Sequence, residues 1–214
     1  MEQLMANAGR HVDFFALMEA LEHPGCPACR LADAAERRFI QTLFDEQVTD
    51  PQTRARLRLA GGFCSRHTEV VLGLGDALGS SIIYADLLAE AARSFTGGGS
   101  ERCPACETGR EATRCALGAL VDHLSEDDVL AAYVNCDGLC LEHLRQATSA
   151  SPPVAADRLA EIERKRLLGL AAECREFVAK SDYLRIGEAM GRERDAWRRA
   201  ALKLGGGFSR DGTE

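Results

Sequence analysis

Eight cysteine and histidine residues follow one spacing pattern that occurs twice in the 214-residue chain. Residues 26–29 read Cys-Pro-Ala-Cys, and the same four residues recur 77 positions later at 103–106. Residues 62–67 read Gly-Phe-Cys-Ser-Arg-His and are matched 76 positions later, at 138–143, by Gly-Leu-Cys-Leu-Glu-His. Thiolates and imidazoles are the groups from which proteins build zinc sites, so the duplicated pattern indicates metal binding.

Zinc chemistry fits this spacing. Zinc is usually held by four ligands in a tetrahedron, and three cysteines with one histidine form an established structural set. Each pair is predicted to lie at a helix N-terminus, where the helix dipole favours the thiolate form that a metal needs. We therefore predict two zinc ions, one in each repeat, and no catalytic residue. The predicted metal ligands are Cys26, Cys29, Cys64 and His67 in the first repeat, and Cys103, Cys106, Cys140 and His143 in the second.

The same ligands leave other hypotheses open. An iron–sulfur cluster or a thiol-based redox centre or sensor could use them, although the histidine in both copies favours zinc. Thiol–disulfide exchange motifs usually lie in a βαβ unit, which the sequence does not predict. An enzyme in which one ligand dissociates from the metal is a third hypothesis, but four protein ligands leave no position for a catalytic water. The eight residues could also be ordinary buried cysteines and core histidines.

The remaining cysteines and histidines are not repeated. Cys115 and Cys136 have no counterpart in the first repeat, so neither is expected to be an essential ligand. Cys174 falls on an apolar helical stripe and is expected in the core. His123 is expected at the surface or at a helix cap. His23 precedes the first pair and could hydrogen-bond a thiolate or replace a ligand, or simply lie in a loop.

The elements that position these ligand pairs are predicted to be helices. Apolar residues recur at three- and four-residue spacing along the chain, and no segment shows the alternation of a strand. The sequence therefore predicts an all-α protein with two repeated metal-stapled helical units and a C-terminal helical pair. The expected helices cover residues 11–22, 29–46, 51–59, 80–95, 106–124, 125–134, 154–180 and 187–204, with two more beginning near residues 64 and 140.

Glycine and proline clusters suggest the domain boundaries. Residues 96–100, Thr-Gly-Gly-Gly-Ser, form the most linker-like interior segment. Two consecutive prolines at 152 and 153 separate the second metal-binding stretch from the C-terminal helices. We expect a first metal-binding unit at 1–96, a second at 97–151, a helical pair at 152–205 and a disordered tail at 206–214.

The paired CPxC and GxCxxH segments resemble an uncharacterised bacterial family that is known only as a domain of unknown function. Residues 180–183, Lys-Ser-Asp-Tyr, and 193–200, Glu-Arg-Asp-Ala-Trp-Arg-Arg-Ala, are similar to the end of that family, so the resemblance covers nearly the whole chain. It implies a metal-type ligand set at the eight positions named above and no particular activity.

Charge and hydropathy indicate the cellular location and the class of binding partner. The net charge of −7 argues against non-specific binding to nucleic acid or anionic membranes and favours a protein partner. No apolar run reaches the ~18–20 residues of a membrane span. No basic region precedes an apolar core at the N-terminus, so a cytoplasmic location is expected. A basic run near the C-terminus could contact nucleic acid or an acidic partner, or form a solvated face: Arg185, Arg192, Arg194, Arg198, Arg199 and Lys203.

Overall fold

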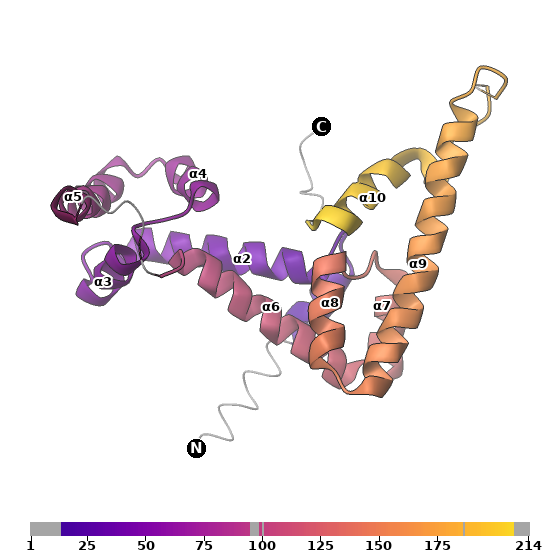
Figure 1. Ribbon diagram of the computed structural model, residues 1–214, viewed down its shortest axis with the longest axis horizontal. Helices are drawn as coiled ribbons and strands as arrows, with labels where there is room; N and C mark the ends of the chain where they lie inside the picture. The colour runs from indigo at the N-terminus through magenta and orange to yellow at the C-terminus, as the bar shows by residue number, and fades with distance from the viewer. Residues whose placement is uncertain (1–13, 95–98, 100, 186, 208–214) are drawn as a thin grey trace. The chain divides into compact units, whose positions relative to one another are not determined.

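The computed structural model describes residues 14–207 except 95–98, 100 and 186, and most of these residues are helical (Figure 1). No strand occurs among the residues described, so the predicted all-α fold is confirmed. Residues 14–21 form the first described helix, and residues 11–13 of the expected 11–22 helix lie outside the described part. Within that part, no helix is both long and apolar enough to cross a bilayer.

Each repeat contains four α-helices. Three of them carry the ligand pairs or lie between them, and a fourth follows the CxxH segment. The additional helix of the first repeat begins at Ala77, and that of the second begins 76 residues later at Pro153. The repeat thus extends through the long helix that the sequence assigns to a separate C-terminal pair. The first repeat comprises α2 (Pro27–Thr42), a π-helical turn (Leu43–Gln47), α3 (Pro51–Ala60), α4 (Ser65–Leu74) and α5 (Ala77–Ser94); the second comprises α6 (Pro104–His123), α7 (Asp127–Asn135), α8 (Leu141–Ala150) and α9 (Pro153–Lys180).

The last helix is shorter than the expected 187–204. It consists of a 3-10 turn (Arg192–Asp195) followed by α10 (Ala196–Gly205), and residues 187–191 are not helical. Gly191 has a non-helical backbone, with φ of −103° and ψ of −136°, and its N–H donates to the Glu193 carboxylate just before the turn. Helix α10 packs against both α8 and α9 (Figure 1).

Local sequence signals explain several helix ends. Asp50 caps α3 by accepting a hydrogen bond from the Thr53 N–H at 2.7 Å, and Pro51 occupies the first helical position, as the sequence predicts. Gly61 ends α3 in the left-handed conformation, with φ of 68°. Proline also begins α2, α6 and α9, where its missing N–H costs nothing.

The chain divides into two compact units. Unit 1 comprises Met1–Leu31 and Thr113–Glu214, and unit 2 comprises Ala32–Ala112. The divisions fall inside α2 and α6, not at the Gly-rich linker near residue 97 or at the two prolines. The units expected at 1–96 and 97–151 stay a prediction from the linker-like segments, and α2 and α6 each begin in one compact unit and end in the other.

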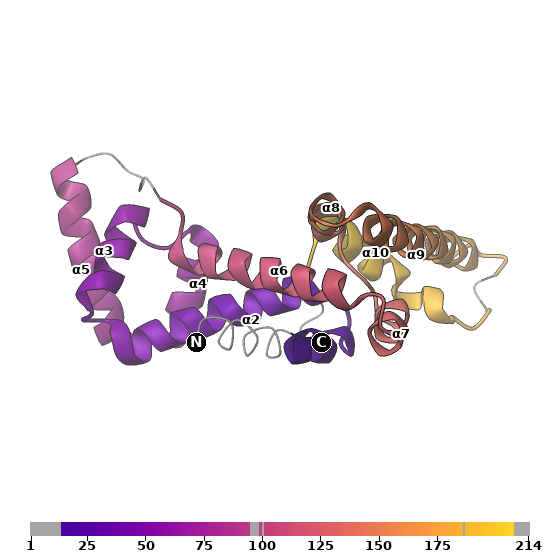
Figure 2. The ribbon, with the colours of Figure 1, turned by 90° about the horizontal axis from the view of Figure 1, so that it is seen from below.

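The cores show why the chain divides there. Unit 2 buries apolar residues of the first repeat, such as Leu57, Val71 and Ile83, together with Cys103 and Ala105 from the start of the second. In unit 2, α3 also packs against α5 (Figure 2).

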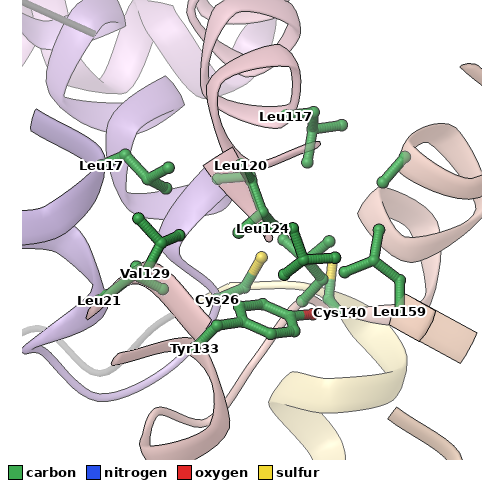
Figure 3. Packing of buried hydrophobic residues seen from close by; sticks show 13 residues of the cluster. Leu17, Leu21, Cys26, Leu117, Leu120, Leu124, Val129, Tyr133, Cys140 and Leu159 are labelled. Atoms are coloured by element: carbon green, nitrogen blue, oxygen red, sulfur yellow. The ribbon is translucent and has the colours of Figure 1, made fainter. Parts of the chain in front are cut away.

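Unit 1 has the reciprocal composition. It buries the equivalent residues of the second repeat, Tyr133, Ala147 and Leu159, with Cys26 and Ala28 from the start of the first (Figure 3). The two repeats thus exchange their first segments, and each core is completed by the CxxC segment of the other repeat.

Candidate metal centres

The first cluster lies in unit 1 and is called site 1: Cys26, Cys29, Cys140 and His143. Its four possible ligand atoms all lie within 4.8 Å of one another. The imidazole Nδ1 of His143 is 3.4 Å from the Sγ atoms of Cys26 and Cys29 and 3.3 Å from that of Cys140. Cys26 and Cys140 are buried beside the leucines of the unit 1 core (Figure 3).

The second cluster lies in unit 2 and is called site 2: Cys64, His67, Cys103 and Cys106. Its four atoms are also within 4.8 Å of one another. The Nδ1 atom of His67 is 3.3 Å from Cys64 Sγ and 3.4 Å from the Sγ atoms of Cys103 and Cys106. The imidazole is fully buried. All eight predicted ligands therefore lie in two groups of four.

The interatomic distances can be compared with those of a tetrahedral zinc site. With Zn–S of about 2.3 Å and Zn–N of about 2.05 Å, tetrahedral geometry places sulfur atoms about 3.8 Å apart and sulfur about 3.6 Å from nitrogen. The observed sulfur separations are 3.8 Å for Cys29–Cys140 and 3.6 Å for Cys64–Cys106. The sulfur–nitrogen separations of 3.3–3.4 Å are slightly shorter. Each group therefore matches the size of a single four-coordinate ion.

The pairing of the ligands corrects the sequence prediction, which assigned each ion to one repeat. Each site takes its CxxC pair from one repeat and its CxxH pair from the other. The two ligand pairs of the first repeat lie in different compact units, because the division falls inside α2, between Leu31 and Ala32. Cys29 lies in its first turn, whereas Glu36, two turns further along, packs against His67. The CxxC pair of the first repeat therefore belongs to unit 1 and its CxxH pair to unit 2, and the division inside α6 separates the two pairs of the second repeat in the same way.

Helix N-termini position all four ligand pairs, as predicted. Cys64 and Cys140 are the N-cap residues of α4 and α8, and the following histidine is in the first turn of each helix. The carbonyl groups of Cys26 and Cys103 accept the first hydrogen bonds of α2 and α6. The positive end of each helix dipole thus faces the thiols and favours their ionised form.

Glycine in each GxCxxH segment allows the turn that presents the cysteine. Gly62 and Gly138 have φ values of 99° and 73°, a region that residues with a side chain rarely adopt. A Cβ atom at Gly62 would press on Leu87 in α5, and one at Gly138 would overlap Glu163 in α9. Leu87 and Glu163 are 76 residues apart and occupy equivalent positions, so the fourth helix of each repeat supports the same turn.

The electrostatics of the clusters favour a bound cation. Hydrogen bonds with Cys140 and Cys26, together with burial, raise the pKa of the Cys29 thiol, whereas hydrogen bonds from Cys26 and Cys29 lower the pKa of Cys140. In site 2, burial and the hydrogen bond with Cys64 raise the pKa of Cys106 to about 12. Three adjacent thiols therefore resist full ionisation on their own. A divalent cation would compensate the charge and displace the remaining protons.

Sequence reasoning missed the role of the chain after α10. Gly206 and Gly207, expected in a disordered tail, lie against site 1, and residues 208–214 are outside the described part. The N–H of Gly207 donates to Cys29 Sγ at 3.2 Å, and its carbonyl accepts from the N–H of Cys26 at 3.1 Å. The only sequence signal is the lack of side chains at 205–207, which permits this close approach to the sulfur atoms.

A buried ionic network supports the loop that carries Cys140. Glu163 is fully buried and accepts hydrogen bonds from Tyr133 Oη at 2.6 Å and from the backbone N–H of Leu139 at 3.2 Å. Arg166 forms an ion pair with the same carboxylate, and Lys203 Nζ of α10 lies 2.5 Å from it. The apolar spacing of α9 gives no hint of this charge at its centre. The network joins α7, α9 and α10 directly beside site 1.

The unrepeated cysteines and histidines lie outside both groups. None of the nine cysteines forms a disulfide, and Cys115, Cys136 and Cys174 belong to neither group of possible ligands. Cys174 is only partly buried, so its expected place in the core is wrong. His123 pairs with Glu126 near the end of α6, as expected of a surface or cap residue, and His23 is exposed in a turn outside both groups.

The fold and the clusters together define an all-α protein with two Cys3His groups, each suited to one metal ion. Residues 11–98 match a family described as "Family of unknown function (DUF6062)", in agreement with the resemblance noted in the sequence. The matched stretch contains the first CxxC and the first CxxH segment, so it supplies two ligands to each site. Comparisons with curated proteins and with solved structures gave no match.

Proposed function

We propose that the protein is a zinc-binding helical adaptor in which sites 1 and 2 each hold one structural zinc ion. The observation that carries this proposal is that four protein ligand atoms in each site lie within 4.8 Å of one another. Four protein ligands fill a tetrahedral zinc and leave no position for a catalytic water. Each ion would join two segments distant in the sequence, and its binding energy would contribute to the stability of the fold.

The alternative of an iron–sulfur cluster is less compatible with these distances. A cluster has several iron atoms and inorganic sulfides between its protein ligands, so those ligands must surround a larger volume. Ligand atoms within 4.8 Å of one another enclose a single ion instead. The presence of an imidazole in both sites also favours zinc over iron held by four thiolates.

An exposed apolar stripe on α10 supports the adaptor role. Trp197, Ala201 and Leu204 follow each other at helical spacing and are exposed, with Trp197 at 61% and Leu204 at 62%. The opposite face of α10 buries Ala196 and Lys203 instead. Exposed tryptophan is uncommon outside binding surfaces and is a frequent anchor of protein interfaces. Since the chain has a net charge of −7, we propose a protein partner rather than nucleic acid.

Metal content tests the first part of the proposal. Protein purified without added metal should be colourless and contain about two zinc ions per chain by inductively coupled plasma mass spectrometry. A brown protein with iron and acid-labile sulfide would establish the iron–sulfur alternative. Protein that is folded, binds no metal and forms disulfides among these residues would instead support a thiol redox role.

Partner capture tests the second part. Wild-type protein and a Trp197→Glu variant, both loaded with zinc, should be compared as baits with the same cell extract. The variant should retain two zinc ions and lose the captured partner, because a charge would replace the exposed anchor. Leu72→Glu, at a residue of α4 that is 67% exposed, is a matched control and should retain the partner. Equal capture by Trp197→Glu and wild type would contradict the role of this face.

A further inference from the structure

Site 2 has a feature outside its ligand set, a carboxylate beside its imidazole. The Nδ1 atom of His67 faces the three thiols, and its Nε2 atom lies 3.2 Å from Oε2 of Glu36. Both side chains are buried, with 2% of the His67 side chain and 8% of that of Glu36 exposed. A histidine that binds a metal through Nδ1 carries its proton on Nε2, where a carboxylate can accept it.

The surroundings hold Glu36 in this position. Arg66 Nη2 lies 2.7 Å from Oε1 and 2.6 Å from Oε2 of the Glu36 carboxylate. The same nitrogen is 3.2 Å from His67 Nε2, but a guanidinium can only donate, so the carboxylate is the acceptor for both groups. Gly109 of α6 leaves the space that Glu36 occupies, because a Cβ atom there would overlap the carboxylate.

None of these three supporting residues has an equivalent of the same kind at site 1. The repeat offset of 77 aligns Glu36 with Thr113 and Gly109 with Ala32, and the offset of 76 aligns Arg66 with Glu142. Threonine cannot supply a carboxylate, a shorter side chain does not require glycine opposite it, and a glutamate cannot hold a carboxylate in place. The ligands are thus duplicated, whereas the support of the imidazole differs in all three positions.

We propose that Glu36 is a positioning residue that makes site 2 the tighter and slower-exchanging metal site, so that site 1 is the exchangeable one. A carboxylate that accepts the imidazole proton fixes the orientation of the ring and increases its basicity, and loss of such a partner typically weakens metal binding 10–100-fold, roughly. This inference rests on the proposed function, because it requires metal in both sites. It adds that the two ions have different roles, one permanent and one exchangeable.

The test measures zinc affinity and release at each site separately in the full-length chain. Cys29→Ser leaves only site 2 intact, and Cys106→Ser leaves only site 1 intact. Competition with the chromogenic chelator 4-(2-pyridylazo)resorcinol should show tighter binding and slower release in the Cys29→Ser protein. Adding Glu36→Gln to it should weaken zinc binding roughly 10–100-fold. In the Cys106→Ser protein the same substitution should change zinc affinity much less than the roughly 10–100-fold expected on loss of such a partner.

Two further measurements separate positioning from a general effect on folding. The visible absorption bands of Co²⁺ bound at site 2 should shift in Glu36→Gln and be restored partly by Glu36→Asp, whereas far-ultraviolet circular dichroism should not change. Should Glu36→Gln fail to fold, Arg66→Gln provides the second variant, because the Arg66 side chain is 58% exposed and its loss frees Glu36 without removing it. It should weaken site 2 in the same direction by a smaller factor.

The outcomes distinguish the two proposals. A chain that binds no zinc would contradict the proposed function itself. A chain that binds two zinc ions and releases both at the same rate, or that responds equally to Glu36→Gln at both sites, would overturn only the role of Glu36.

Discussion

The Sγ atom of Cys29 lies 3.8 Å from that of Cys140, although 111 residues separate the two in the chain. The cysteine expected to share its site, Cys64, lies instead 3.6 Å from Cys106. Each site therefore joins the two repeats, and the repeated sequence does not correspond to a repeated, self-contained domain. This crossed arrangement makes predictions that differ from those of two independent zinc modules.

Paired substitutions test the crossed ligand sets directly. Cys29→Ser combined with Cys140→Ser should leave one zinc ion per chain, because both residues belong to site 1. Cys29→Ser combined with Cys64→Ser should leave none, because the two residues belong to different sites. Zinc-to-protein ratios measured after gel filtration would decide the matter. Independent modules require the reverse result, while Cys115→Ser should retain both ions in either case.

Gly206 should control the stability of site 1 through its backbone. Its φ of 81° and ψ of 159° lie in a region that only glycine adopts readily. Gly206→Val should strain the segment by about 1–3 kcal/mol and weaken the bond between Gly207 N–H and Cys29 Sγ. We expect zinc to leave site 1 at least about fivefold faster in chelator competition, with site 2 unaffected. Gly205→Ala, where an added Cβ meets no neighbour within 4 Å, should behave as wild type.

Lys203 should contribute at least as much to stability as Tyr133, another partner of Glu163. Lys203→Met removes one of two cations beside a fully buried carboxylate and should cost about 3 kcal/mol, the lower end of the range for a broken buried pair, since Arg166 remains. Tyr133→Phe removes one hydrogen bond and should cost about 1–3 kcal/mol.

Urea unfolding of the zinc-loaded protein would measure both effects. Lys165→Met breaks an exposed pair with Glu161 and should cost less than about 1 kcal/mol. A loss in Lys165→Met as large as that in Lys203→Met would show that burial does not determine these contributions.

Glu193 should make the stability of the C-terminal region dependent on acid. The N–H of Gly191 and the ammonium of Lys180 donate to its carboxylate and lower its pKa from 4.5 to about 2. Because the folded-state pKa is depressed, the stabilisation is present above pH 4.5 and is lost as the pH falls towards 2. Glu193→Gln should therefore lose less free energy of unfolding than wild type between pH 6 and about 3.

Zinc loss in acid should affect both proteins equally, since Glu193 is not among the ligands of either site. The comparison must therefore be made at matched zinc content. Parallel pH profiles for the two proteins would exclude this contribution.

The sequence predicts the helices well, and it also predicts which cysteines and histidines form the two groups of possible ligands, because both depend on local patterns. Asp50 and Pro51 mark the start of α3, and the duplicated cysteines and histidines mark the two groups of four. The pairing between the groups could not be predicted, because it depends on which compact unit each ligand pair joins, and the chain divides inside α2 and α6. The sequence also could not predict which face of α10 is buried. The charged Lys203 is buried and forms an ion pair with Glu163, whereas the apolar Trp197 is exposed.

The ligands of site 2 all lie within residues 64–106, and those of site 1 lie on either side of them, at 26–29 and 140–143. In the sequence, the four ligands of site 2 therefore lie between the two ligand pairs of site 1. During synthesis from the N-terminus, the Cys26–Cys29 pair leaves the ribosome first and yet waits for the last ligand, His143. The ligand set of site 2 is complete 37 residues before that of site 1, counted from Cys106 to His143. We therefore expect metal to bind site 2 before site 1 during synthesis, and Cys26 and Cys29 to remain without their partner ligands longer than Cys103 and Cys106 do.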